Sequence, residues 1–389
     1  MKEESGKIKL ILTGRIDSTN ASAVEAELLS EMDAQKGKEI VIEADGLEYI
    51  SSAGLRVLMK IRKSSGKPLE ILDVSRDVYD IFEMTGFTEL FDVKKAYRSI
   101  NTDDFEVIGK GFFGTVYRMD NDSIVKVYRG ADKLPMIENE IKTAKKAFVS
   151  GIPTAIAYDI VKVGEDYGSV FEMINARTFH ELLQDGEIPF DDIVKRYVTF
   201  LKQIHGTELE AGTFPSYREI YLKYLEVIRK HLIDEQYEGL KKLLTLMEDE
   251  CTVVHGDVQM KNVMMSDDEP LLIDMDTLGL GNPVFDFAGL CVTYRLFEED
   301  DPDNSMAFLG ITGETVEKLW SGIIDYYFEF EDDEQRKQVL DRIALVASIR
   351  FLYLLESTDL KESELGRKRL AHTREHIGEL LRTVTKLSV

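Results

Sequence analysis

The chain has 389 residues, of which 44% are hydrophobic, so it is long enough for two domains with substantial cores. Its formal net charge is −24 at pH 7, which disfavours nucleic acids and anionic membranes as partners. No run of about 18 apolar residues is present to span a bilayer, and the first residues are too acidic and polar to begin a secretory signal, so we expect a cytoplasmic protein.

We expect residues 1–98 to form a small α/β domain, because strand and helix patterns alternate along them. Residues 1–99 carry a net charge of −3 and the rest of the chain −21, so the acidity belongs to the second part. The expected strands are Lys7–Thr13, Glu39–Glu43 and Leu69–Leu72, and the expected helices are Ala21–Asp33 and Asp77–Glu83.

Ser51 and Ser52 precede an apolar helical pattern and can be interpreted in two ways. Serines in this place are ordinary helix N-caps, since a hydroxyl accepts a hydrogen bond from a free amide. A phosphate here would also be stabilised by the free N–H groups of the helix, and it would add close to two negative charges to the surface. The residues alone leave both interpretations open.

This first part resembles the anti-sigma-factor antagonist, or STAS, domain. The resemblance is carried by Gly14–Asp17, Ser51–Leu55 and Met84–Phe87. It implies that Ser52 is a regulatory phosphorylation site and that an anti-sigma factor or similar regulatory protein binds the domain.

Residues 92–103 are polar and contain neither glycine nor proline, so they are either a short tether or a continuation of structure. We place the boundary near residue 99, giving domains at residues 1–98 and 99–389.

Gly109, Gly111 and Gly114 form a G-x-G-x-x-G-x-V run that ends at Val116, with apolar residues on both sides. This pattern is typical of a hairpin. Glycines allow the backbone to fold closely over phosphate groups, because a Cβ would hold the loop away. Any glycine-rich hairpin can produce the pattern by chance, so it indicates a phosphate loop only together with other residues.

Lys126 lies in an expected strand, Ser123–Tyr128, and is either a phosphate ligand or an ordinary solvent-facing lysine. A helical pattern follows from Ile137 to about Phe148. Within it Glu140 is the acid best placed to pair with Lys126, Glu138 is the rival, and solvation at the surface is the alternative for both.

The run from His255 to Asn262, followed by Asp274, contains a possible general base and two possible metal ligands. Asp257 could orient a substrate hydroxyl and accept its proton. Asn262 and Asp274 supply hard oxygen ligands for the Mg²⁺ ions that carry the phosphates of ATP. The sequence therefore predicts phosphoryl transfer with ATP as substrate and Mg²⁺ as cofactor.

In this order the residues resemble the protein-kinase-like fold, specifically its aminoglycoside and choline phosphotransferase branch. The catalytic run is His-Gly-Asp, Gln259 stands where protein serine kinases usually carry lysine, and the stretch from Asp274 to Asp286 is too short for an activation loop. The segment Gly281–Ala288 is similar to the one that contains a loop-bracing aspartate in this branch.

The resemblance implies a two-lobed domain, with an N-lobe at about residues 99–175 and a mostly helical C-lobe at about residues 176–389. It places Glu172 and Ile174, at the end of an expected strand Tyr167–Ile174, beside the adenine ring. It also implies that His255 braces the catalytic loop. Asp276 either adds a metal contact or caps the following loop.

Helical patterns dominate the rest of the chain, at Asp191–His205, Tyr217–Leu232, Glu235–Met247, Gly313–Phe330, Glu334–Leu355 and Arg367–Leu381. We expect His205 to bond core polar groups. The tyrosines at positions 217–224 either pack the core or wall an acceptor pocket. Cys251 and Cys291 lack metal-like spacing and should be buried reduced thiols.

Two functions are consistent with this pattern. The first is an ATP- and Mg²⁺-dependent phosphotransferase with an alcohol acceptor, in which the STAS-like domain is regulatory; Gly256 and Gln259 favour a small molecule over a protein as that acceptor. The second is a regulatory protein whose kinase-like domain senses nucleotide without turnover, or phosphorylates its own Ser52.

Overall fold

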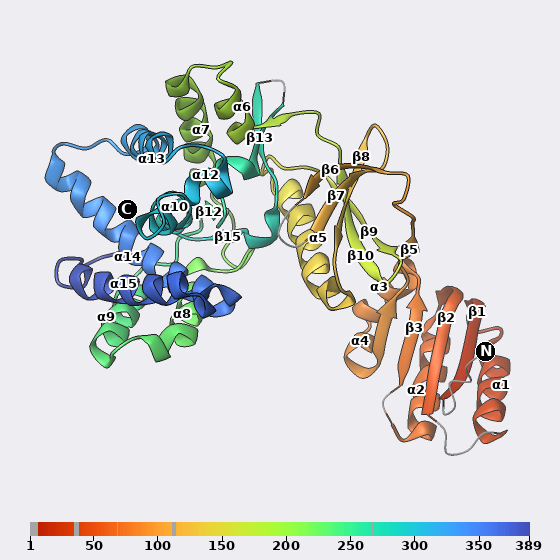
Figure 1. Ribbon diagram of the computed structural model, residues 1–389. Helices are drawn as coiled ribbons and strands as arrows, with labels where there is room; N and C mark the ends of the chain where they lie inside the picture. Colours follow the sequence, from red (N-terminus) through yellow and green to blue (C-terminus); the bar gives the residue numbers. More distant parts are fainter. Residues whose placement is uncertain (1–6, 35–38, 68, 111–113, 267) are drawn as a thin grey trace. The chain divides into compact units, whose positions relative to one another are not determined.

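The computed structural model describes residues 7–34, 39–67, 69–110, 114–266 and 268–389. The chain divides into two compact units, one of residues 1–101 and 161–164 and one of residues 102–160 and 165–389 (Figure 1). Among the described residues, no helix combines the length and apolar character needed to cross a membrane.

The first unit is a four-stranded parallel sheet with helices between its strands. In β1, buried Ile8 and Leu10 alternate with exposed Lys9 and Ile11, so one face of this strand lies in the core. The strands follow the order β1 (Lys7–Ile16), β2 (Glu39–Ile50), β3 (Glu70–Val74), β4 (Asp92–Lys95), and the helices are α1 (Ala21–Ala34), α2 (Ser52–Ser65), α3 (Arg76–Met84) and α4 (Phe87–Leu90).

Residues 92–103, for which two interpretations were open, are partly structured. Asp92–Lys95 form β4, and β5 (Arg98–Ser99) pairs in parallel with Val161 and Lys162.

The second unit begins with a sheet and one long helix, α5 (Leu134–Val149), which follows a 3₁₀ turn at Ala131–Lys133. The strands lie in the order β9-β10-β8-β7-β6, and β6 to β8 and β10 pair antiparallel. Their bounds are Glu106–Lys110 (β6), Gly114–Arg118 (β7), Ser123–Tyr128 (β8), Ala157–Val163 (β9) and Asp166–Glu172 (β10).

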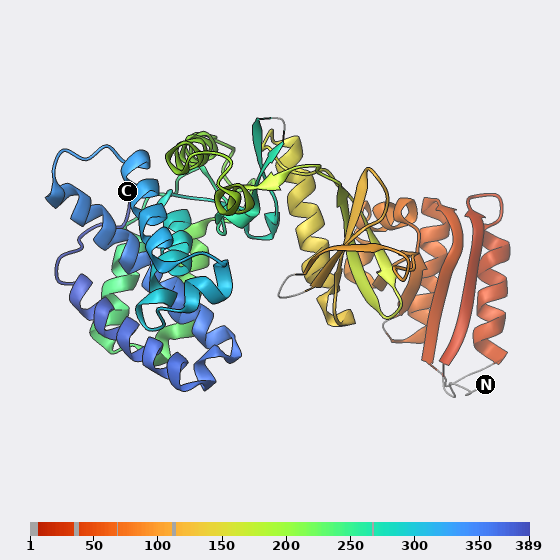
Figure 2. The same ribbon diagram turned by 45° about the horizontal axis from the view of Figure 1, so that its top comes forward.

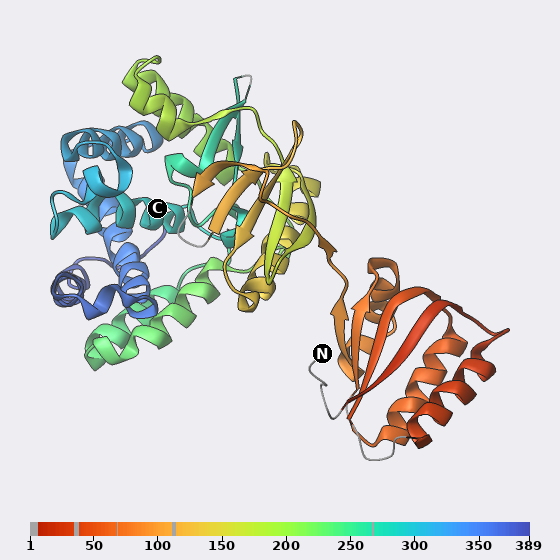
Figure 3. The same ribbon diagram turned by 45° about the vertical axis from the view of Figure 1, so that its right-hand side comes forward.

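The rest of the second unit is mostly helical. In Figures 2 and 3 the green-to-blue helices from α7 onward form one group and the yellow-to-orange sheet another. The helices are α6 (Phe179–Asp185), α7 (Phe190–His205), α8 (Tyr217–Ile228), α9 (Asp234–Thr245), α10 (Val284–Cys291), α11 (Phe297–Glu299), α12 (Asn304–Leu309), α13 (Gly313–Tyr327), α14 (Asp333–Ser357) and α15 (Glu364–Leu380).

Short elements connect these helices, and the run from His255 to Asn262 lies among them. The short strands are β11 (Arg177–Thr178), β12 (Val253–Val254), β13 (Val263–Ser266), β14 (Glu269–Leu272) and β15 (Gly279–Leu280). The single-turn helices are Arg229–His231, Met260–Asn262 (η3), Met275–Thr277 (η4) and Asp359–Glu362, and a π-helical turn covers Val292–Leu296. The strand-rich part followed by a helical part confirms the predicted fold class.

The two cysteines differ in exposure. Cys291 is buried in α10, and burial raises the pKa of its thiol to about 12. Cys251 is only partly buried, because it lies in the connection between α9 and β12, so the prediction of full burial is wrong for this residue.

Candidate active site

Lys126 on β8 is held by two carboxylates. Its Nζ lies 2.9 Å from Oε1 of Glu140 on α5 and 2.5 Å from Oδ1 of Asp274. Burial alone would lower the pKa of Lys126, but the negative charges of Glu140 and Asp274 outweigh it and raise the pKa. The lysine is therefore a fixed cation, and the structure selects Glu140 over Glu138 as its helix partner.

Glu140 is itself fixed by hydroxyl groups from the sheet. Only 2% of it is exposed, and its Oε2 accepts hydrogen bonds from Tyr128 (2.6 Å) and Ser169 (2.9 Å). A buried carboxylate is tolerated where such donors and a cation replace its hydration. The sequence pattern gave no reason to single out Tyr128 or Ser169, since both stand in strands where such residues usually pack.

Asp274 stands at the start of η4 with φ of 59°, a left-handed conformation that is uncommon outside glycine. Two residues later, loss of hydration around its carboxyl raises the pKa of Asp276 to about 6. Repulsion from Glu140 and Asp274 acts in the same direction, and Lys126 acts against it. The region thus concentrates carboxylates around one lysine.

Asp257 is oriented by two amide side chains. Nε2 of Gln259 lies 3.3 and 3.2 Å from its two carboxylate oxygens, and Nδ2 of Asn262 donates to its Oδ2 (2.9 Å) and to its carbonyl oxygen (2.8 Å). The amide of Ile273, next to Asp274, donates to the Asn262 carbonyl at 3.0 Å. Asp257, Asn262 and Asp274 are therefore joined through short contacts.

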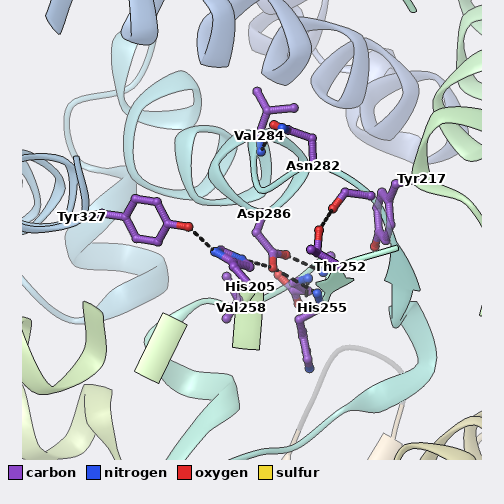
Figure 4. A network of polar contacts seen from close by, with 12 residues as sticks. His205, Tyr217, Thr252, His255, Val258, Asn282, Val284, Asp286 and Tyr327 are labelled. Atoms are coloured by element: carbon purple, nitrogen blue, oxygen red, sulfur yellow. Dashed lines mark hydrogen bonds and ion pairs between the residues drawn. The ribbon is translucent and has the colours of Figure 1, made fainter. Parts of the chain in front are cut away.

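Asp286, at the start of α10, holds the backbone that leads into Asp257 (Figure 4). Its Oδ2 accepts from the His255 amide at 3.0 Å and its Oδ1 from the Gly256 amide at 2.5 Å. Nε2 of His205 lies 3.0 Å from Oδ2, and Nδ1 of His205 lies 2.9 Å from the Tyr327 hydroxyl. The prediction that His205 bonds core polar groups is confirmed.

The pKa of Asp286 lies below its usual value. Burial opposes ionisation of this carboxyl, but hydrogen bonds from His205 and the His255 amide, with the nearby imidazoles, outweigh burial. Asp286 is thus a buried carboxylate at neutral pH.

Three further side chains hold the run from His255 to Asn262 from other elements. The Tyr197 hydroxyl donates to the Val258 carbonyl at 2.5 Å, the Met260 amide donates to the Tyr294 hydroxyl at 3.3 Å, and the Thr277 hydroxyl donates to the His255 carbonyl at 2.7 Å. Nε2 of His255 lies 3.0 Å from the Ile273 carbonyl, which agrees with a bracing role. These contacts fix the loop from α7, the π-helical turn and η4, and from the connection at Ile273.

The tyrosines of α8 belong mainly to the core. Tyr217 and Tyr221 are buried and pack on Phe285, with ring centroids 5.4 and 4.7 Å away. The Tyr217 hydroxyl donates to the Thr277 carbonyl at 2.7 Å and occupies the space where a Cβ of Gly256 would lie. Gly256 has φ of 85°, so both its conformation and its surroundings require glycine.

The glycine hairpin is present where the structure describes it. Gly109 on β6 pairs with Val116 on β7, and Val116 pairs with Lys126 on β8. A Cβ at Gly114 would collide with the Val127 carbonyl, so this glycine permits close packing of the two strands. Gly111 lies outside the described residues.

The expected hinge strand ends as β10 at Glu172. The Glu172 amide donates to the Ile156 carbonyl (2.9 Å), its carboxylate accepts from the Ile156 amide (3.1 Å), and the Met173 amide donates to the Asp122 carbonyl (2.9 Å). Glu172 and Ile174 line a cavity of about 440 Å³ with residues of the 148–154 and 266–271 segments. The amides of Glu172 and Met173 are thus engaged within the protein.

At the other candidate site, α2 begins between the two adjacent serines. Ser51 is the N-cap, and its hydroxyl accepts from the Ala53 amide at 3.2 Å. Ser52 is the first helical residue and is exposed. The cap and the candidate phosphorylation site are therefore different residues.

Comparison with known proteins identifies both units. Residues 104–319 match the family model described as "Phosphotransferase enzyme family", and residues 1–92 match the model described as "Mlab, STAS domain". The chain belongs to the phosphotransferase enzyme family. The phosphotransferase is 34% identical over 97 residues to the "Putative anti-sigma factor antagonist BtrV" of Bordetella bronchiseptica. This match covers 24% of the phosphotransferase and 82% of the relative.

Solved structures of aminoglycoside phosphotransferases also resemble the phosphotransferase. ADP-bound APH(2'')-Ib gives a TM-score of 0.48 at 16% sequence identity, and the match covers 72% of this chain and 94% of the chain of that structure. The streptomycin-ATP ternary complex of APH(2")-IIa gives 0.45 at 14% identity and covers 72% and 92%.

Proposed function

We propose that the chain transfers the γ-phosphate of ATP to a hydroxyl group of a small molecule and requires Mg²⁺. The observation that carries this proposal is the joined set of Lys126, Asp274, Asn262 and Asp257. One fixed cation, two oxygen ligands and one oriented carboxylate are the parts that phosphoryl transfer uses.

Each side chain has a role in this proposal. Asp257 orients the acceptor hydroxyl and accepts its proton, Lys126 contacts the phosphates, and Glu140 positions Lys126. The glycine hairpin, with Gly109, Gly111, Gly114 and Val116, covers the nucleotide. The segment from Glu172 to Ile174 borders the adenine ring, with Ile174 and the residues after it as its backbone partners, because the Glu172 and Met173 amides are engaged.

Asn262 and Asp274 fit Mg²⁺ as ligands. The Asn262 amide nitrogen points at Asp257, which leaves its oxygen for a cation, and Asp274 supplies a carboxylate. No three His, Cys, Asp or Glu side chains in the described part of the chain are grouped as a metal site, which suits an ion held partly by phosphates and water. Bound there, Mg²⁺ would neutralise charge on the phosphates.

A small acceptor is favoured by the segment between Asp274 and Asp286. It contains η4, β15 and the start of α10, and it runs directly into the buried brace of the catalytic loop. The segment leaves no length for a protein-binding activation loop. Gln259, at hydrogen-bond distance from Asp257, occupies the position that a lysine usually holds in serine kinases.

The second part of the proposal is that the STAS domain regulates the enzyme through a phosphate on Ser52 and through an anti-sigma factor or similar partner. Ser52 is exposed at the first position of α2, where free N–H groups and the helix dipole stabilise a phosphate. A phosphate adds nearly two negative charges there.

Phosphate mapping tests the first part and asks whether the chain phosphorylates its own Ser52. We expect the full chain to consume ATP when Mg²⁺ and a panel of small alcohols are supplied, to stop when a chelator is added, and to leave its own Ser52 unmodified. Mass spectrometry of the parent and of Asp257→Asn, each incubated with Mg-ATP or Mg-GTP, gives the readout. Phosphate on Ser52 in the parent alone would indicate self-phosphorylation, and absence of consumption with every acceptor would favour a nucleotide sensor.

Replacing Glu140 by Gln should lower kcat/KM for ATP by about 10- to 100-fold, because Lys126 loses the charge that positions it. The amide oxygen can still accept from Tyr128 or Ser169, so the fold should persist. Glu138→Gln, on the same helix, is the matched control and should leave kcat/KM unchanged. Steady-state kinetics at varied ATP concentration measures kcat/KM for both variants. Equal losses in the two would show that Glu140 does not position Lys126.

A further inference from the structure

The carbonyl oxygen of Gly256 is held by a side chain from far along the chain. Nη1 of Arg350, in the C-terminal half of α14, donates to this oxygen. Asp286 binds the amide of the same residue, and Thr277 binds the preceding carbonyl. The backbone that leads into Asp257 is thus held by hydrogen bonds to both its N–H and its C=O groups.

α10 leaves space for this contact at Gly289. A Cβ there would lie 3.2 Å from the Gly256 carbonyl oxygen, which is tighter than ordinary van der Waals contact, and 3.4 Å from Nη1 of Arg350. A glycine on one helix therefore lets an arginine on another reach the catalytic loop.

Arg350 also brings a permanent charge close to Asp257. Burial opposes the charge, but Tyr221 and Asp257 lie near enough to raise the pKa of Arg350 above its usual value. A guanidinium does not lose its proton in proteins, so this cation is constant over the working pH range.

The left-handed backbone of Gly256 explains why a hydrogen bond to its carbonyl group is needed. Glycine has few steric limits, so with φ of 85° the peptide between Gly256 and Asp257 can rotate unless its carbonyl is bound. Rotation of that peptide would turn the Asp257 carboxylate away from Gln259 and Asn262. A misplacement of about 1 Å at a reacting group can cost about 100-fold in rate.

We propose that Arg350 is a positioning residue of the phosphotransferase: it binds the Gly256 carbonyl and thereby sets the direction of the Asp257 carboxylate. This proposal rests on the proposed role of Asp257. It assigns to α14, which contributes no residue to the nucleotide contacts proposed above, a direct part in aligning the site.

A double-mutant cycle in the full chain tests the proposal, with ADP release from Mg-ATP and water as the acceptor. Arg350→Met should lower kcat about 100-fold with KM for Mg-ATP changed less than about twofold. The same substitution in an Asp257→Asn background should lower kcat no further, because its target is already gone. Arg350→Lys, which can still donate to a carbonyl, should recover part of the loss.

Arg369→Met is the matched control. Arg369 on α15 is buried, with 5% exposed, and like Arg350 it donates to a backbone carbonyl, that of Phe297, at 2.6 Å. Its loss should lower the melting temperature and leave kcat unchanged. If Arg350→Met is unfolded, Arg350→Lys replaces it in the double-mutant cycle.

Two results would overturn the proposal while leaving that for Asp257 in place: parental kcat in Arg350→Met, or an equal loss in both backgrounds. A parental rate in Asp257→Asn alone would instead remove the proposed catalytic role of Asp257, and the Arg350 proposal with it.

Discussion

Replacing Asp257 by Asn should lower the rate of phosphoryl transfer by about 10²- to 10⁴-fold and leave the affinity for Mg-ATP nearly unchanged. An amide cannot accept the hydroxyl proton, and the proposed nucleotide contacts come from other residues. Transfer to the best acceptor of the panel gives kcat, and titration calorimetry gives the nucleotide affinity.

The structure limits how much this substitution can disturb the fold. Gln259 and Asn262 both donate to the Asp257 carboxylate, so an Asn side chain would turn its NH₂ toward one of these donors. Loss of one such bond costs about 1 kcal/mol. Asp341→Asn, in the i,i+4 pair with the exposed Lys337, is the matched control and should keep full activity. Parental turnover by Asp257→Asn would disprove the role.

Replacing Asp286 by Ala should lower the free energy of unfolding by about 3–5 kcal/mol and abolish transfer. The carboxylate is 1% exposed, and its removal leaves the His255 and Gly256 amides and the His205 ring without their acceptor in the interior. Urea unfolding followed by circular dichroism measures the stability. Asp300→Ala is the control, because the ion-pair partners of Asp300, which are Lys368 and His372, are both exposed.

The same carboxyl gives a pH signature. Its pKa is lower in the folded protein than in the unfolded chain, where about 3.9 is usual, so its stabilisation is complete above that value and is lost as the pH falls through the folded pKa. The difference in unfolding free energy between the parent and Asp286→Asn should therefore shrink below about pH 4. A difference that stays constant from pH 7 to pH 2 would mean that Asp286 is not a charged brace.

Local patterns predicted much of the fold because they report directly on the environment of each element. The strand Ser123–Tyr128 has the predicted bounds, and α7 begins one residue early and ends where predicted. The helix α10 escaped prediction because all eight of its residues are buried, which removes the polar face that marks a helix. β2 runs past its predicted end at Glu43. Asp45-Gly46 has the composition of a turn, but in the structure these residues lie at a register shift within the strand.

The candidate site was predicted only where the order of residues carries the information. Lys126 and Glu140 could be paired from their spacing on a strand and a helix, and the structure joins them. Arg350 could not be found in this way, because it lies 94 residues after Gly256 in a long helix rich in charged and apolar side chains. Contacts between such distant segments depend on how helices pack, which short motifs do not encode.

The ion pair between Lys126 and Asp274 would couple the two binding events proposed for these residues. Each partner is proposed to bind a different component, phosphate for the lysine and metal for the aspartate, yet in the structure they satisfy each other at 2.5 Å. Whichever component arrives first must compete with this pair and, by engaging one partner, releases the other. Thermodynamic linkage then requires that metal and nucleotide each strengthen the binding of the other by the same factor.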